Sequence, residues 1–187
     1  ALGFAPDDVV VSFVSRLVWE KDLRTFIDSV RLAQQQEPRI KILIGGDGPI
    51  RGELENELPD AVFTGYKSGE ALARVYAAGD MFCFPSDTET FGKVSLEAMA
   101  CGLPAVVADA VGSRSLVKHE ETGFHVPAQQ PEAFAQKLLL LARDEGLRRR
   151  MAGAAAAHAQ TYDWERVMQD LIDTYHGMVG RSSNPLR

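Results

Sequence analysis

Short apolar runs alternate with longer segments of helical spacing, and this alternation constrains the fold more than any other feature of the sequence. The apolar runs span residues 9–14, 41–44, 61–64, 81–84, 105–107 and 123–126. The segments with helical spacing span residues 22–36, 49–57, 70–78, 91–101, 131–144, 146–159 and 163–178. Strands that alternate with helices in this way form βαβ crossovers. The pattern therefore predicts an α/β fold, a Rossmann-like domain with a mostly parallel sheet flanked by helices.

Composition excludes several classes of protein. The 187 residues carry a formal net charge of −6, which argues against a nucleic-acid binder, because such proteins need a basic face. The two cysteines, Cys83 and Cys101, form neither a metal pattern nor a disulfide framework, which favours a reducing, cytoplasmic location. No apolar run approaches the ~20 residues that span a bilayer. The sequence begins with Ala1 rather than methionine, so we expect a piece of a longer protein.

Glu97 is the first candidate for a binding residue. Ligands of parallel sheets bind at the carboxyl ends of the strands, and Glu97 lies about one and a half turns into the helix expected there, at 91–101. Its neighbours in the sequence are mostly apolar, and a carboxylate is costly to bury unless strong donors meet it. A vicinal diol, such as that of a ribose, offers two donors to one carboxylate. The alternative is an exposed or ion-paired helix glutamate, and both interpretations stay open.

Three loops at the same edge offer sites for an anion. The helix that starts near Phe91-Gly92 directs its positive dipole end towards the strand termini, where a phosphate would bind. Arg16 and Lys21 flank the loop after the first strand and could neutralise a diphosphate. Each feature has a plainer alternative, namely a simple helix start and a pair of solvated surface cations. The loop Gly45–Pro49 could likewise admit a ligand or form a tight turn in which Asp47 is structural.

Other nucleotide-binding and metal-binding motifs are missing from the sequence. It contains no GxxxxGK[ST] element of a phosphate-loop NTPase, and no GxGxxG follows the first strand. Asp87-Thr88-Glu89 resembles an acidic metal triplet, but no further carboxylates or histidines cluster with it. We therefore expect neither a metal site nor a cofactor.

Taken together, the motifs resemble a known family. They occur in the order Ser15-Arg16-Leu17-Val18-Trp19-Glu20-Lys21, Gly46-Asp47-Gly48-Pro49, Phe63-Thr64-Gly65-Tyr66, and Pro85-Ser86-x2-Glu89-x7-Glu97-Ala98-Met99-Ala100-x-Gly102-x-Pro104. In this context they resemble the C-terminal, donor-binding domain of the retaining glycosyltransferases of family 4, the glycosyl transferases group 1. These enzymes have the GT-B architecture of two facing Rossmann-like domains, and the resemblance covers residues 1–187 as one of the two.

The resemblance assigns roles to individual residues. It implies that Arg16 and Lys21 bind the donor diphosphate, that Glu97 binds the ribose, and that Glu89 faces the donor sugar. The backbone N–H groups of Phe91 and Gly92 would hold the β-phosphate. The donor-binding residues that it implies are Arg16, Lys21, Tyr66, Lys67, Glu89, Thr90, Phe91, Gly92, Lys93 and Glu97. The catalytic residues that it implies are Glu89, Arg16 and Lys21.

The sequence departs from the family pattern at two positions. Ser15 stands where the family usually has glycine, which is a mild change. Ser115 replaces a frequent acidic residue after a Gly-rich turn at residues 112–115, so a ligand contact from that position is not expected.

The resemblance also implies an activity for the whole protein. A retaining hexosyltransferase would transfer a sugar from a UDP- or GDP-linked donor to the hydroxyl of an acceptor sugar or lipid, which an absent N-terminal domain binds. The domain alone would bind the donor without turnover, and peripheral association with the inner face of a membrane stays open. The helix at 163–178 would pack either on the absent domain or on this one. A non-catalytic nucleotide-binding module and a non-hydrolysing sugar-nucleotide epimerase are the alternatives.

Overall fold

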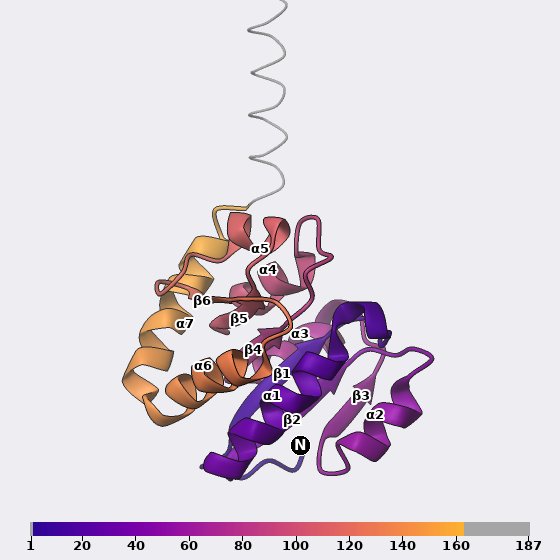
Figure 1. Ribbon diagram of the computed structural model, residues 1–187. Coiled ribbons are helices and arrows are strands. Elements are labelled where there is room, and N and C mark those ends of the chain that lie inside the picture. The colour runs from indigo at the N-terminus through magenta and orange to yellow at the C-terminus, as the bar shows by residue number, and fades with distance from the viewer. Residues whose placement is uncertain (1, 163–187) are drawn as a thin grey trace, which may run out of the picture.

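A parallel sheet of six strands forms the centre of the computed structural model, which describes residues 2–162 (Figure 1). The strands are β1 (Val9–Val14), β2 (Ile40–Gly45), β3 (Val62–Gly65), β4 (Met81–Phe84), β5 (Ala105–Ala108) and β6 (Gly123–Val126). They are arranged in the order β3-β2-β1-β4-β5-β6, and every described pairing between them is parallel. The predicted Rossmann-like α/β fold is confirmed. The helix expected at 163–178 lies outside the described residues.

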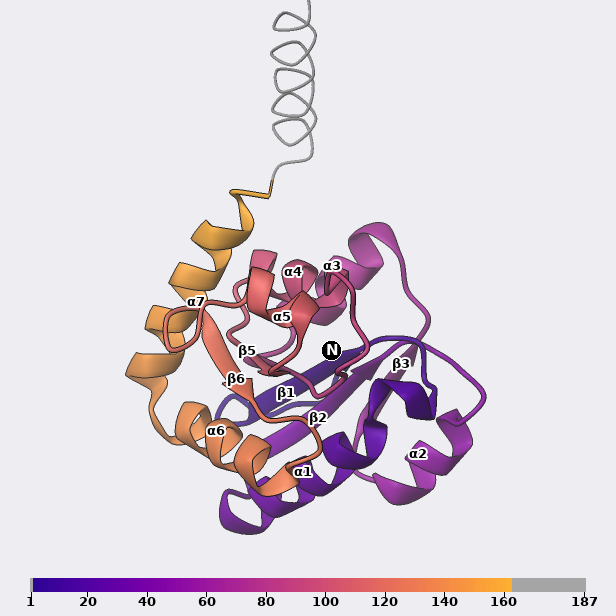
Figure 2. The same cartoon turned by 45° about the horizontal axis from the view of Figure 1, so that its top comes forward.

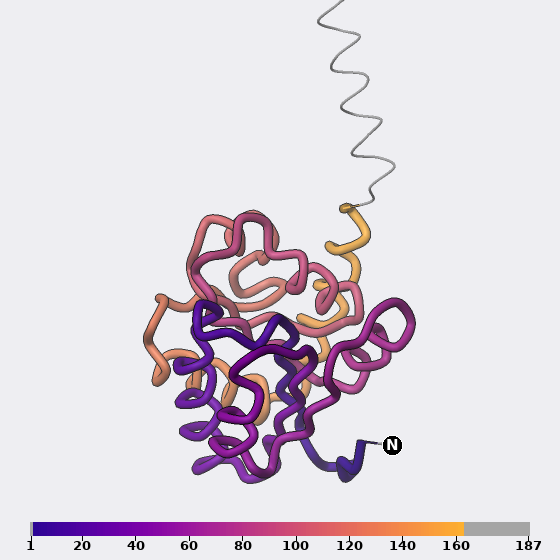
Figure 3. Tube along the Cα trace, turned by 90° about the vertical axis from the view of Figure 1, so that its right-hand side faces the viewer, coloured from indigo at the N-terminus to yellow at the C-terminus, as the bar shows by residue number. Residues whose placement is uncertain are grey.

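Helices cover both faces of this sheet. They are α1 (Leu23–Gln36), α2 (Arg51–Glu57), α3 (Gly69–Ala77), α4 (Lys93–Ala100), α5 (Val111–Leu116), α6 (Pro131–Arg143) and α7 (Glu145–Ala159), with a short 3-10 helix η1 (Trp19–Lys21) after β1. Figure 2 shows α1 and α6 on one face and α3 and α4 on the other, while α7 packs beside α4. The N-terminal end and the end of α7 lie at opposite ends of the domain (Figures 1 and 3).

The order of the strands locates a crevice at the carboxyl edge of the sheet. From β1 the chain adds β2 and β3 on one side, then returns to add β4 and its successors on the other side. The loops after β1 and β4 therefore leave the sheet in opposite directions, and parallel sheets bind ligands at such a topological switch point. This point lies between the predicted segments 15–21 and 85–92.

The central strands form the core because their side chains are buried on both faces of the sheet. All six residues of β1 are buried, as are all four residues of β4. The ring of Phe13 packs against Phe26 from α1 and Phe84 from β4, with ring centroids 5.0 Å and 5.5 Å apart. The switch point is therefore built on two buried, closely packed strands.

The structure corrects the bounds of three predicted segments. Helix α2 begins at Arg51 rather than at 49, because Pro49 lies in a turn that the Arg51 N–H closes onto the Gly48 carbonyl at 3.2 Å. Helix α4 begins at Lys93 rather than at 91, because Gly92 has a φ of +79° and cannot extend it. The Gly-rich turn expected at 112–115 is instead part of α5. Within residues 2–162, no helix is long and apolar enough to cross a membrane.

Candidate functional site

Glycines hold the loops after β1 and β2 in close contact. A Cβ atom on Gly46 would lie 1.8 Å from the carbonyl oxygen of Ser15, and one on Gly48 would lie 2.2 Å from that of Leu17. The Leu17 N–H donates to the carbonyl of Asp47 at 2.9 Å, and the Asp47 carboxylate accepts the Gly48 N–H at 2.8 Å. Only glycine allows this approach, so the Gly-Gly-Asp-Gly segment fixes the loop that carries Arg16.

A cavity of about 330 Å³ opens above these loops at the carboxyl ends of β1 and β2. Its lining residues are Val14, Ser15, Arg16, Gly46, Asp47, Tyr66, Lys67, Leu72, Val94 and Glu97. Four predicted donor-binding residues, Arg16, Tyr66, Lys67 and Glu97, thus surround one space. Two cations and two carboxylates around an apolar floor suit a ligand that carries both polar groups and a flat ring.

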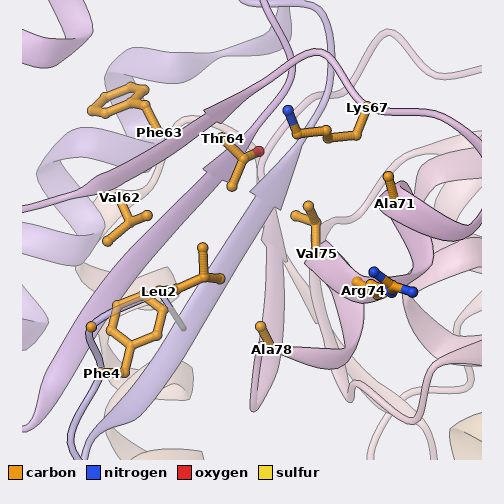
Figure 4. Close-up of a pocket in the computed structure, with 11 residues that line it drawn as sticks. Leu2, Phe4, Val62, Phe63, Thr64, Lys67, Ala71, Arg74, Val75 and Ala78 are labelled. Carbon is orange, nitrogen blue, oxygen red and sulfur yellow. The ribbon is translucent and has the colours of Figure 1, made fainter.

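A larger cavity of about 680 Å³ lies beside β3 and α3 (Figure 4). Apolar side chains dominate its walls, including Leu2 and Phe4 of the N-terminal segment and Val75 of α3. Lys67 is the only predicted donor-binding residue among its lining residues. The smaller cavity is the better candidate, because it lies where the strands of the sheet end and gathers the charged residues.

Glu97 is half-buried rather than enclosed by apolar groups. It is the fifth residue of α4, and 32% of its side chain is exposed. The hydroxyl of Tyr76 donates a hydrogen bond to Glu97 Oε2 at 3.0 Å, and Lys93 Nζ lies 3.6 Å from Oε1. Burial raises the pKa of Tyr76, and the Glu97 carboxylate raises it further. The Tyr76 hydroxyl therefore stays protonated and acts as the donor.

An ion pair crosses the switch point. Lys21, in the loop after β1, places Nζ 2.5 Å from Oε1 of Glu89, in the loop after β4. Both side chains are largely buried, with 19% and 22% of their surface exposed. The hydroxyl of Thr88 adds a second link between the loops, donating to the carbonyl of Glu20 at 3.4 Å. The structure thus brings together two of the three residues predicted to be catalytic.

Three cations at this edge are already paired with glutamates. Arg16 forms an ion pair with Glu20, four residues further along the chain, and both side chains are mostly exposed. Lys21 is paired with Glu89, and Lys93 lies near Glu97. The positive charge expected for anion binding is therefore present, and protein carboxylates neutralise it in the described residues.

The loop that leads into α4 lies beside the cavity rather than in its wall. Thr90 and Phe91 are exposed, and so is the side chain of Lys93. Gly92 forms the N-cap of α4, and no side chain caps this end of the helix. A Cβ on Gly112 of α5 would lie 2.3 Å from the carbonyl oxygen of Glu89. Helix α5 thus supports the loop that carries Glu89.

The sequence interpretation did not include three residues that shape this site. Tyr76 sits in an apolar helical pattern and is typical of a core aromatic residue, so no local signal indicates its bond to Glu97. Glu20 belongs to a quoted motif, and its spacing of four residues from Arg16 is the one available signal for the ion pair. The sequence indicates Gly112 only as part of a turn. Within residues 2–162, no group of three or more His, Cys, Asp or Glu side chains could hold a metal ion.

The fold and the cavity define a Rossmann-like α/β domain with a charged site at the carboxyl edge of its sheet, where parallel sheets bind ligands. The chain belongs to the glycosyl transferases group 1 family, whose model matches residues 1–158. The predicted group 1 glycosyltransferase domain is therefore confirmed at the level of the family.

Named relatives agree with this assignment. A GDP-mannose-dependent alpha-mannosyltransferase of Mycolicibacterium smegmatis is 36% identical over 174 residues, which are 93% of this chain and 44% of that protein. A D-inositol 3-phosphate glycosyltransferase of Salinispora tropica is 34% identical, over 89% of this chain and 38% of that protein. The chain thus spans less than half the length of these curated relatives.

Solved structures share the fold. Anabaena HepE in complex with UDP-glucose superposes with a TM-score of 0.81 at 28% identity, over 94% of this chain and 50% of that one. The C-terminal domain of a group 1 family glycosyl transferase, LpcC of Francisella tularensis, has a TM-score of 0.72 at 22% identity. That match covers 82% of this chain and 85% of the LpcC domain.

Proposed function

We propose that this chain is the donor-binding, C-terminal domain of a retaining glycosyltransferase of family 4, and that it binds a nucleoside diphosphate sugar. The observation that carries the proposal is the cavity that gathers Arg16, Tyr66, Lys67 and Glu97 at the carboxyl ends of the strands. Membership of the family supports it, as does the binding of UDP-glucose by the similarly folded HepE.

In the proposed complex the nucleoside occupies this cavity. The Glu97 carboxylate accepts hydrogen bonds from the ribose hydroxyls, and the backbone at Tyr66 and Lys67 lines the base. The exposed Arg16 side chain leaves Glu20 to bind the diphosphate, so it exchanges one anionic partner for another. Exposed ion pairs contribute only about 0 to 1 kcal/mol, so this exchange costs little.

In the proposed reaction the bond between the anomeric carbon and the diphosphate oxygen breaks, the acceptor hydroxyl attacks from the same face, and its proton passes to the departing diphosphate. Positive charge develops on the sugar, and negative charge develops on the diphosphate. Arg16, Lys21 and the backbone N–H groups at Phe91 and Gly92 stabilise the leaving group by preorganised electrostatics. Glu89 orients the sugar and offsets the charge at the anomeric carbon.

The proposed domain extends over residues 1–187, and a further domain of the longer protein binds the acceptor sugar or lipid. The chain alone therefore binds the donor without turnover. The LpcC match supports a self-contained domain, because that structure is of a C-terminal domain by itself. The free thiols of Cys83 and Cys101 support a reducing, cytoplasmic location, with peripheral attachment to the membrane where the acceptor is a lipid.

Calorimetric titration of the 187-residue chain with UDP, GDP and ADP, with and without Mg²⁺, tests the proposal. One nucleotide is expected to bind independently of Mg²⁺, and Arg16→Ala and Glu97→Ala are each expected to weaken binding about tenfold or more. Arg31→Ala is the matched control, because Arg31 pairs with Glu57 away from the cavity. Failure of all three nucleotides to bind both this chain and the full-length protein would refute the proposal, as would binding that neither site variant changes.

A further inference from the structure

Tyr76 is a buried residue with a polar contact to the proposed site. It belongs to α3, only 1% of its surface is exposed, and its ring packs edge-on against Phe82 at 6.1 Å between centroids. Its hydroxyl reaches across to α4 and donates to Glu97 Oε2 at 3.0 Å. The ring packs in the core, whereas the hydroxyl forms a hydrogen bond with the Glu97 carboxylate.

Glu97 stands between two cavities. It lines the cavity of about 330 Å³ that also contains Arg16, and a second cavity of about 290 Å³ that extends between α3 and α4. The second cavity is lined by Gly69, Leu72, Ala73, Tyr76, Glu97, Ala100 and Cys101. A glutamate side chain has three rotatable bonds, so free space on both sides allows more than one orientation of its carboxylate. The Tyr76 hydroxyl selects one of them.

The oxygen that Tyr76 does not bind is available to a ligand. Among residues 2–162, Lys93 Nζ at 3.6 Å is the nearest cation to Glu97 Oε1, and the Lys93 side chain is exposed and easily displaced. A carboxylate oxygen can accept two hydrogen bonds, so Oε2 also keeps capacity after it accepts from Tyr76.

We infer that Tyr76 is a positioning residue for recognition of the ribose: its hydroxyl holds the Glu97 carboxylate in the orientation that accepts the ribose hydroxyls. The inference deepens the proposed function and rests on it. Tyr76 touches neither nucleotide nor sugar, and it acts only through Glu97. A carboxylate that is already oriented loses less conformational entropy when the ligand binds, which is the source of the gain in affinity.

The variant Tyr76→Phe tests this role, because it removes one oxygen atom and keeps the ring that packs against Phe82. UDP and GDP, and their 2′,3′-dideoxy forms, are titrated calorimetrically into the full chain of the wild type and the variant. Affinity for the ribonucleotide that binds is expected to fall about tenfold, while affinity for its dideoxy form stays the same. The preference for the ribonucleotide therefore shrinks by the same factor.

Two further variants separate positioning from packing. Tyr162→Phe is the matched control, because it removes a tyrosine hydroxyl that donates to the Ser115 carbonyl at 2.7 Å, and it is expected to keep the preference of the wild type. In a Glu97→Gln background, Tyr76→Phe is expected to cause no further loss of preference. Thermal unfolding of each variant reports the state of the core.

Two results overturn the inference. If Tyr76→Phe weakens the ribonucleotide and the dideoxy form equally, the hydroxyl supports the fold and does not orient Glu97. If Tyr76→Phe leaves the preference for the ribonucleotide unchanged, the Tyr76 hydroxyl is not needed to orient Glu97. Failure of the proposed function has a different signature: the wild type then binds neither UDP nor GDP, or binds with no preference for the ribose and no response to Glu97→Gln.

Discussion

The substitution Gly112→Ala has two opposite effects on the free energy of unfolding, and the structure gives the sign of each. Gly112 lies in α5, where alanine is favoured over glycine by up to about 1 kcal/mol of helix propensity. Its Cβ, however, would lie 2.3 Å from the carbonyl oxygen of Glu89 and 3.0 Å from the carbonyl carbon of Thr90. Both are backbone atoms, so no change of side-chain rotamer relieves the contact. Restoring an ordinary 3.4 Å contact with that oxygen requires a displacement of 3.4 − 2.3 = 1.1 Å.

That displacement determines the expected result. Overpacking of this kind costs about 1 to 3 kcal/mol, which exceeds the gain in propensity, so Gly112→Ala is expected to unfold at lower urea concentration than the wild type. The loop that moves carries Glu89, which the proposal places against the donor sugar. Misplacement by about 1 Å can reduce turnover about 100-fold. The full-length variant is therefore expected to lose transfer activity.

Gly153→Ala provides the matched control. Gly153 is also in a helix, α7, and a Cβ there would meet no atom within 4 Å. Only the propensity effect applies, so this variant is expected to gain up to about 1 kcal/mol in its free energy of unfolding. Urea denaturation of both variants measures the contrast. The reasoning is refuted if Gly112→Ala is as stable as Gly153→Ala and transfers sugar at the rate of the wild type.

Two other predictions concern the chemical modification of the two cysteines and the stability of the chain at low pH. Cys101 is exposed whereas Cys83 is fully buried, so iodoacetamide is expected to modify only Cys101 in the native chain, and mass spectrometry after unfolding in urea should show both modified. Partial burial of its sulfur and the nearby Glu97 carboxylate raise the pKa of Cys101, so its modification is expected to be slower than that of a free thiol. The hydrogen bond from Arg114 holds the pKa of Asp109 below its usual 3.8. The contribution of this carboxylate to stability is therefore present above that value and lost as the pH falls through the lowered pKa, so the difference between the urea midpoints of wild type and Asp109→Asn should shrink as the pH falls through the lowered pKa.

The alternation of apolar and amphipathic segments predicted the elements of the fold well, because each segment carries its own signal. The β-branched run at 9–14 matches the bounds of β1, and the spacing after Asp22 matches α1. Helix α4 begins two residues later than predicted. The left-handed backbone of Gly92 ends the preceding loop there, and the spacing of apolar residues does not indicate it. Helix α5 is only six residues long, too short for a periodic pattern to distinguish it from a turn.

The loops that form the candidate site could be predicted from the sequence, because the topology of the sheet determines where they lie. Parallel strands bring their carboxyl ends to one edge, so the loops could be named before their contacts were known. The contacts themselves join distant positions: Lys21 and Glu89 are 68 residues apart, and Tyr76 and Glu97 are 21 apart. A local pattern contains no information about which of several charged residues will meet across an edge. Pairing therefore had to come from the structure.

The two ion pairs at the switch point differ in burial, and this difference suggests how the proposed donor would be accommodated. Arg16 and Glu20 are mostly exposed, so water screens their attraction and either side chain can leave the other at little cost. Lys21 and Glu89 are largely buried, and separating them would leave two charges without partners in a poorly solvated crevice. A diphosphate would therefore draw Arg16 away from Glu20 and approach Lys21 while Lys21 keeps Glu89 in place. Lys21 would then stabilise the leaving group with its charge. It would also hold the Glu89 carboxylate in the orientation that contacts the sugar.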